Sequence, residues 1–98
     1  EYELQEDYIY QMNVYKTEAL QNDISNQIRQ SGYENVVVSV SSDNYATQFK
    51  VSAIYVELSN LVITDQAQHT NILDIEKEIL QIILSRADVD EAEVHFER

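Results

Sequence analysis

The chain has no cysteine, no proline and no tryptophan, a single glycine, and only six basic residues against 18 acidic ones. Without cysteine it can form no disulfide, thiolate metal site or cysteine nucleophile. With Gly32 as the sole glycine, it has no glycine-rich loop to cradle a phosphate group. Gly-x-Ser-x-Gly and HExxH motifs are absent, and the acids are spread over every segment instead of being gathered for paired-carboxylate catalysis. We therefore expect neither an enzyme nor a cofactor site.

The formal net charge of −12 is shared by both halves of the chain, and no basic stripe occurs. Such a surface repels phosphate backbones and anionic headgroups, so we expect no binding to nucleic acid or to a membrane surface. The longest apolar runs, 36–38 and 61–63, are far shorter than the roughly 20 residues that a membrane helix needs. Contact with a membrane is expected only through a segment absent from this chain.

The length and composition fit one small folded domain over residues 1–98, because 44% of the residues are hydrophobic and short domains have one core. The chain begins at Glu1 and not at methionine. We expect it to be a soluble piece of a longer, membrane-anchored chain.

Residues 3–31 form one helical pattern without glycine or proline, and it stops at Gly32. Glycine suits the left-handed position after a helix, where a residue with a Cβ is strained. Ile28 in the last turn and Tyr33 beyond the glycine give the apolar pair that accompanies such a stop. We predict a positive φ at Gly32, with Ile28 and Tyr33 as its structural partners.

The apolar residues of this helix lie on two different faces. A helix over 3–31 would be about 43 Å long, whereas a seven-residue strand is about 23 Å long, so its first part, about residues 1–16, is predicted to project beyond a sheet. One face, which we predict to cover the sheet, carries Leu20, Ile24 and Ile28; the other carries Leu4, Tyr8, Tyr15 and Ala19. We interpret Leu4, Tyr8 and Tyr15 as an interface, the alternative being that the early turns fray or pack onto the domain's own core.

Two strands are predicted at 35–41 and 48–58, joined by turn residues 42–44. In the second, Phe49, Val51, Ala53 and Tyr55 fall on one face. Past Ala53 the alternation fails, because Ile54, Val56 and Leu58 are also apolar. We expect that end of the strand to be covered on both faces or to contact a partner. Residues 59–69 give no clear prediction.

A second helix is predicted over 71–86, with Asn71 as its N-cap and Arg86 near the negative end of its dipole. Its isoleucines form a stripe that Leu73, Leu80 and Leu84 widen beyond what one face of a three-stranded sheet can cover. We interpret these three leucines as a second interface. A last strand over 91–97 alternates Ala92, Val94 and Phe96 inward with Glu93, His95 and Glu97 outward.

The acidic run 88–93 contains no glycine for a calcium loop, and its acids are interpreted as solvated. Glu93, His95 and Glu97 would lie about 6.6–7 Å apart along one side of a strand, too far apart for neighbouring ligands of one ion. His69 has no histidine at metal spacing and is interpreted as a surface or capping residue. We expect no metal site.

The element order therefore predicts an α+β fold, αββαβ, with two helices packed on one face of a three-stranded sheet. The second and last strands are predicted to be parallel, joined through the second helix.

This order resembles the ring-building motif of secretion and flagellar ring proteins, and the chain is most similar to the C-terminal soluble domain of the stage III sporulation protein AF family. The resemblance is carried by the long helix ending at Ser31-Gly32-Tyr33, the hairpin 36–58, the isoleucine-rich helix 71–86 and the closing segment 93–97. It implies a membrane-anchored, non-enzymatic subunit of a channel between mother cell and forespore, whose soluble domain lies between the two membranes. Its implied partners are other channel subunits or copies of itself.

An alternative interpretation is a free cytoplasmic adaptor or regulator that binds a basic protein partner through charge complementarity. Apolar segments of about 20 residues upstream of Glu1 would favour the anchored subunit, and a native start near Glu1 the adaptor. In either case we expect the isolated domain to be a monomer or a weak oligomer.

Overall fold

The computed structural model describes the backbone of residues 2–98 and the side chains of residues 7–98. The side chain of Leu4 therefore lies outside the described residues. The elements in chain order are α1 (Tyr2–Gln30), β1 (Tyr33–Glu34), β2 (Val37–Ser42), β3 (Val51–Glu57), β4 (Val62–Ile63), α2 (Ile72–Arg86), the 3₁₀-helix η1 (Glu91–Glu93) and β5 (Val94–Glu97).

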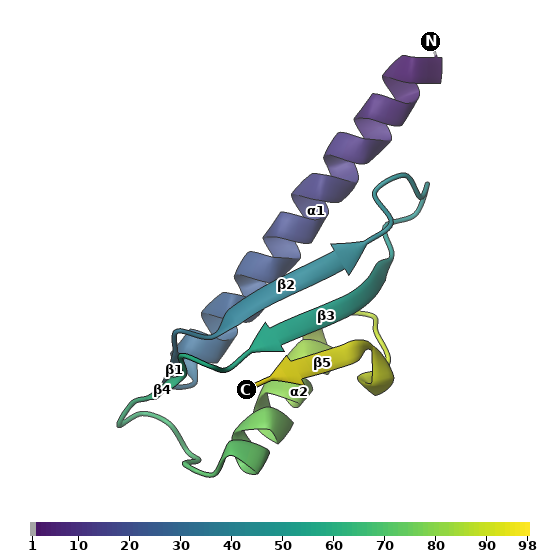
Figure 1. Cartoon of the computed structure of the whole chain (residues 1–98). Coiled ribbons are helices and arrows are strands. Elements are labelled where there is room, and N and C mark those ends of the chain that lie inside the picture. Colours follow the sequence, from purple (N-terminus) through teal and green to yellow (C-terminus); the bar gives the residue numbers. More distant parts are fainter. Residues whose placement is uncertain (1) are drawn as a thin grey trace.

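The main sheet has the strand order β2-β3-β5, with β3 antiparallel to β2 and parallel to β5. Both helices pack on the same face of this sheet, α1 along β2 and α2 behind β3 and β5 (Figure 1). The predicted α+β fold of two helices on a three-stranded sheet is confirmed, and so is the parallel pairing of the second and last main strands.

The core lies between the sheet and the two helices. Its fully buried isoleucines come from every layer: Ile24 and Ile28 from α1, Ile54 from β3, and Ile75, Ile79 and Ile83 from α2. Each such side chain stabilises the fold by about 1.5–3 kcal/mol relative to exposure. The N-terminus of α2 is held by Asn71, whose Oδ1 accepts the Leu73 N–H at 2.9 Å, as the sequence predicted for an N-cap.

The first helix ends where the sequence predicted. Gly32 has a φ of +97°, and its N–H donates to the Arg29 carbonyl at 3.0 Å, tightening the last turn. Ile28 and Tyr33 are both buried beside it.

Residues 59–69 include a short strand that the sequence pattern did not reveal. The β4 strand pairs antiparallel with β1, and Tyr33 lies opposite Ile63. The Gly32 carbonyl accepts two hydrogen bonds from Thr64, one from its backbone N–H at 2.9 Å and one from its Oγ1 hydroxyl at 2.8 Å. Strands of two residues whose partner is about 30 residues away leave no local period to detect.

One prediction for β3 was wrong. Ile54, Val56 and Leu58 face the core, whereas Ala53 is half-buried and Tyr55 is 45% exposed on the outer face. The cause is a β-bulge: Ser41 pairs with Ala53 but Ser42 pairs with Val51, so Ser52 is an extra residue. The extra residue reverses the alternation, which explains its failure. The outer face is not covered at Tyr55, and contact of this end of the strand with a partner remains a prediction.

The last strand was predicted too long. Residues 91–93 form η1, because the Glu93 and Val94 N–H groups bond to the Asp90 and Glu91 carbonyls. As a result Ala92, predicted to face inward, is exposed. From Val94 the prediction is confirmed: Val94 is buried and Phe96 packs on the core, while His95 and Glu97 face outward.

Candidate interaction surfaces

The first described turns of α1 extend past the end of the sheet, which makes the molecule 54 Å long and about 22 Å across (Figure 1). Along the N-terminal half of α1, Tyr8 and Tyr15 are 65% and 69% exposed, and Met12 is exposed as well. Ala19, on the same predicted face, is also exposed. Tyr8 and Tyr15 are therefore free to meet a partner, and their role in an interface remains a prediction.

The contact between α1 and the sheet begins earlier along the helix than the sequence indicated. Tyr10 packs against Tyr45 of the β2–β3 loop with ring centroids 5.3 Å apart. Asn13 is only 4% exposed, and its Nδ2 donates to the carbonyls of Asn44 and Ala46 at 2.9 and 2.8 Å. The projecting part is therefore shorter than the predicted residues 1–16.

A polar stripe on α1 covers the outer edge of β2. The Oγ atoms of Thr17 and Ser42 are hydrogen-bonded at 2.7 Å, and Gln21 Oε1 accepts the backbone N–H of Val40 at 3.1 Å. Together with Asn13, these helix residues are four positions apart and so lie on one face. The role of these three residues was not predicted from the sequence, although hydrogen-bonding side chains spaced four residues apart indicate a polar helix face. An exposed strand edge invites pairing with other chains, and this stripe blocks it.

Replacing Asn13 by alanine is expected to loosen the β2–β3 loop. Two loop carbonyls lose their donor, but they lie near the surface where water can replace it, so we expect a loss of about 1–2 kcal/mol. Hydrogen exchange of the amides in residues 43–50 should accelerate. The matched control is Asn22→Ala, an exposed asparagine of the same helix. Equal exchange in the two variants would contradict the assignment.

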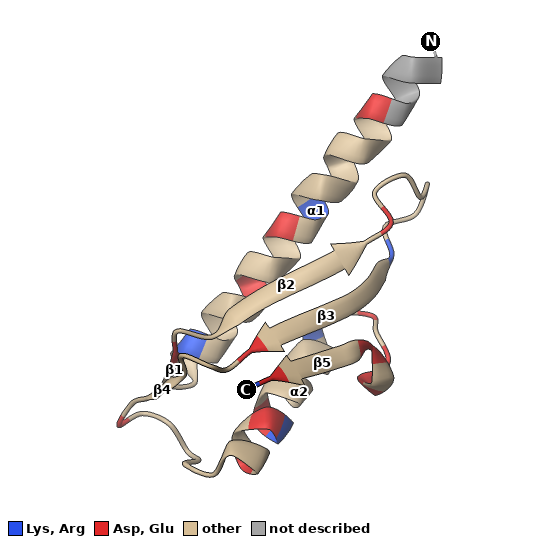
Figure 2. Ribbon diagram, viewed as in Figure 1, with Lys and Arg blue, Asp and Glu red and all other residues tan. Residues whose placement is uncertain are grey.

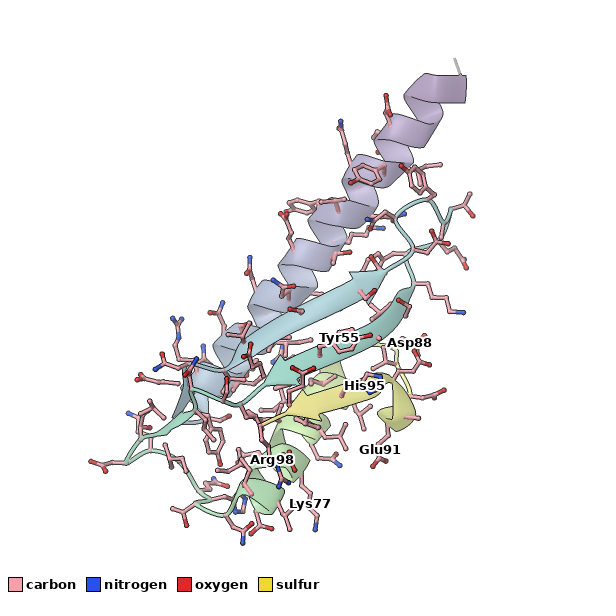
Figure 3. The ribbon with its side chains drawn as sticks, viewed as in Figure 1. Tyr55, Lys77, Asp88, Glu91, His95 and Arg98 are labelled. Atoms are coloured by element: carbon pink, nitrogen blue, oxygen red, sulfur yellow. The ribbon has the colours of Figure 1, made fainter. Side chains whose placement is uncertain are left out.

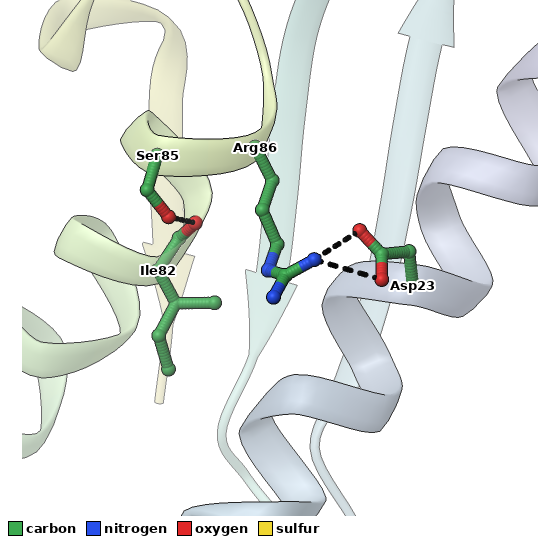
Figure 4. Close-up of polar contacts among 4 residues, drawn as sticks. All are labelled: Asp23, Ile82, Ser85 and Arg86. Carbon is green, nitrogen blue, oxygen red and sulfur yellow. Dashed lines mark hydrogen bonds and ion pairs between the residues drawn. The ribbon is translucent and has the colours of Figure 1, made fainter.

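An ion pair joins the two helices. The Nη1 of Arg86 donates to Asp23 Oδ1 and Oδ2 at 2.9 and 2.7 Å (Figure 4). Ser85 Oγ donates to the Ile82 carbonyl in the same turn. Because both charged groups are partly exposed, the pair stabilises the fold by no more than about 1 kcal/mol. Arg86 thus has a specific partner in addition to the helix dipole.

A groove of about 650 Å³ lies between α1, the end of the β2–β3 loop and the end of α2. Leu20, Phe49 and Val51 supply apolar walls, and Lys50 and Asp88 contribute one charge of each sign. Its remaining charge, Arg86, is already held by Asp23. The residues that line the groove include no nucleophile paired with a base.

The leucines of α2 differ in exposure. Leu73 is 56% exposed, whereas Leu80 and Leu84 are half-buried at one flank of the isoleucine stripe. Leu80 still packs against the core. Apolar surface therefore remains on this side of α2, and its part in an interface remains a prediction.

Tyr33 is buried and ties the end of α1 to α2. Its Oη donates to Glu78 Oε1 at 2.5 Å, and the same oxygen lies 3.8 Å from His69 Nε2. Burial, together with the bond to and the negative charge of Glu78, raises the pKa of Tyr33 from 10.0 to about 12. His69, interpreted as a surface or capping residue, is half-buried beside Glu78.

The outer face of the main sheet carries an aromatic pair. Tyr55 of β3 stacks on His95 of β5, with ring centroids 5.2 Å apart, and Figure 3 shows the two side by side.

Within residues 7–98, no group of three or more histidine, aspartate or glutamate side chains is placed to hold a metal ion. Glu93, His95 and Glu97 thus do not converge.

In the described part of the chain, neither helix combines the length and the apolar character needed to cross a bilayer. Comparison with known protein families, with curated proteins and with solved structures found no match to this chain.

Proposed function

We propose that this chain is a non-enzymatic assembly domain that packs against other subunits of a membrane-anchored complex. The observation that carries the proposal is the exposure of Tyr8 and Tyr15 on α1, whose first described turns extend past the sheet. Tyrosine is typical of protein interfaces, because its ring is apolar and its hydroxyl can bond at the rim. If α1 served only to cover this sheet, it could begin near the β2–β3 loop.

The resemblance to the stage III sporulation protein AF family supports a more specific proposal. The complex would be the channel between mother cell and forespore, with this domain in the space between the two membranes. The partners would be other channel subunits or further copies of this chain. Enzymatic activity, a cofactor and nucleic-acid binding form no part of this function.

The net charge sets a condition on such packing. Copies carrying −12 repel one another, and salt screens this repulsion because the Debye length falls from about 10 Å at 0.1 M to about 3 Å at 1 M. Association of the isolated domain should therefore be weak at low salt and should rise with salt. In a membrane, tethering would raise the local concentration and favour the same contacts.

Changing Tyr8 and Tyr15 together to serine is expected to lower self-association at high salt and leave the fold intact, because both side chains are exposed. Sedimentation equilibrium across the salt range measures this, with circular dichroism to verify folding. Tyr55→Ser, which removes an exposed tyrosine from the sheet instead, is the control. A mass that responds to neither salt nor the double substitution would contradict packing through α1.

The adaptor hypothesis is favoured by one observation: 18 acidic residues stand against six basic ones, and the acids occur on both helices and at the ends of β3 and β5 (Figure 2). A cytoplasmic adaptor would bind a basic partner through this surface. The complete coding sequence separates the two proposals. Apolar segments of about 20 residues before Glu1 favour the anchored subunit, and a start codon next to Glu1 favours the adaptor.

A further inference from the structure

The main sheet has one covered edge and one open edge. At β2 the outward N–H of Val40 is bonded by Gln21 of α1. At the other edge, β5 pairs only with β3. The Leu58 N–H donates to the Glu97 carbonyl, so the backbone groups of Glu97 face β3. Because successive residues of a strand alternate, the N–H and C=O of Phe96 point away from the sheet. Among the described residues no hydrogen bond reaches them.

An apolar strip on α2 lies on the side of this open edge. Glu78 bonds to Tyr33, which lies just past the C-terminal end of α1, and Arg86 bonds to Asp23 of α1. Glu78 and Arg86 therefore mark the side of α2 that faces α1. Glu76 bonds instead to Arg98, which directly follows β5, and so marks the opposite side. At about 100° per residue, Leu80 and Leu84 lie about 40–80° further round from Glu76, away from α1. The leucine strip, defined as Leu73, Leu80 and Leu84, thus lies on the β5 side of α2.

The same edge is strongly acidic. Glu91 and Glu93 precede β5 in η1, Glu97 ends it, and Glu57 lies opposite Glu97 on β3. Figure 2 shows these acids at η1 and at the ends of β3 and β5, and Figure 3 places Glu91 at the η1 end with His95 on the outer face. A strand added here would have its outer face beside these carboxylates and its inner face toward the β5 side of α2, which carries the leucine strip.

We propose that the β5 edge is a docking site for an extended segment of a partner protein in which basic residues alternate with apolar ones. Its backbone would bond to the N–H and C=O of Phe96, which extends the sheet to a fourth strand. Its basic side chains would lie on the outer face near Glu93 and Glu97, and its apolar side chains would cover the leucine strip. The alternation follows from the pleat, because successive residues of a strand point to opposite faces.

A second copy of this chain does not suit the site. Its own β2 edge is bonded by Gln21, and its β5 edge would bring Glu93 and Glu97 against the same acids. The docking site uses a different surface from the tyrosines of α1 and does not depend on the proposed function.

A synthetic peptide that alternates lysine and valine tests the proposal. Fluorescence anisotropy measures its binding to the intact chain, with a glutamate–valine peptide and a backbone N-methylated lysine–valine peptide as controls. Only the unmethylated lysine–valine peptide is expected to bind. On binding, amide exchange of Phe96 measured by NMR should slow by about tenfold or more, because this amide gains a partner.

Charge reversal in the protein separates a specific site from general attraction. Glu97→Lys and Glu18→Lys change the net charge equally, but Glu18 is an exposed residue of α1, which packs along β2 at the opposite edge of the sheet from β5. We expect Glu97→Lys to weaken binding about fivefold and Glu18→Lys to change it less than about twofold. Equal effects of the two substitutions, binding of the methylated peptide, or an unchanged Phe96 amide would overturn the proposal. So would protection of that amide by self-association without peptide.

Discussion

Replacing Gly32 by alanine is expected to destabilise the protein by about 3 kcal/mol or more, the largest effect of any single substitution proposed. The φ of +97° is strained for any residue with a Cβ. In addition, a Cβ at this position would lie 2.4 Å from the Ala67 backbone nitrogen and 2.8 Å from its Cα. Backbone atoms cannot rotate away, so residues 64–67 would have to move and the two Thr64 hydrogen bonds to the Gly32 carbonyl would weaken.

The neighbouring Asn35 provides a control for this prediction. It has a φ of +62° and is exposed. Asn35→Ala therefore tests the cost of an alanine at positive φ at an exposed position. We expect it to cost about 1 kcal/mol. Urea unfolding monitored by circular dichroism gives both values. If Gly32→Ala lowered the free energy of unfolding no more than Asn35→Ala, the close approach of Ala67 would not contribute to the effect. The bulkier Gly32→Val should be at least as destabilising as Gly32→Ala.

Raising the pH from about 10 to about 12 is expected to remove about 2–3 kcal/mol of stability through Tyr33. Its pKa is 10.0 when unfolded and about 12 when folded. Because the folded value is raised, this contribution is fully present below pH 10 and is lost as the pH rises through 12, as the unfolded chain releases a proton that the folded chain retains.

Tyr33→Phe isolates this contribution, because it keeps the buried ring and removes the ionising hydroxyl. The variant should be less stable near neutral pH by about 1–2 kcal/mol for the lost bond to Glu78. Its stability should also fall less steeply between pH 10 and 12 than that of the parent. Urea unfolding at several pH values measures both, and parallel pH profiles for the two proteins would contradict the assignment. The other six tyrosines are present in both proteins, so their contributions cancel in the comparison.

The sequence by itself determined features that depend on neighbouring residues. The end of α1 follows from Gly32, because one residue without a Cβ suffices to permit a positive φ. The N-cap of α2 follows from Asn71, and the buried face of α2 from isoleucines at helical spacing. These local signals fixed the element order, and the order together with short connections left the α+β arrangement as the natural packing.

Only the tertiary structure decided the features that depend on residues far apart in the chain. The bulge at Ser52 arises from the register between β2 and β3, so no period within β3 could locate it. The β1–β4 pair, the burial of Asn13 and the pairing of Tyr33 with Glu78 each join segments about 30 or more residues apart. The open β5 edge likewise depends on distant residues, because it lies at the end of the sheet only through the pairing of β5 with β3. A local pattern records what a residue prefers, whereas these contacts depend on which distant residue the fold brings beside it.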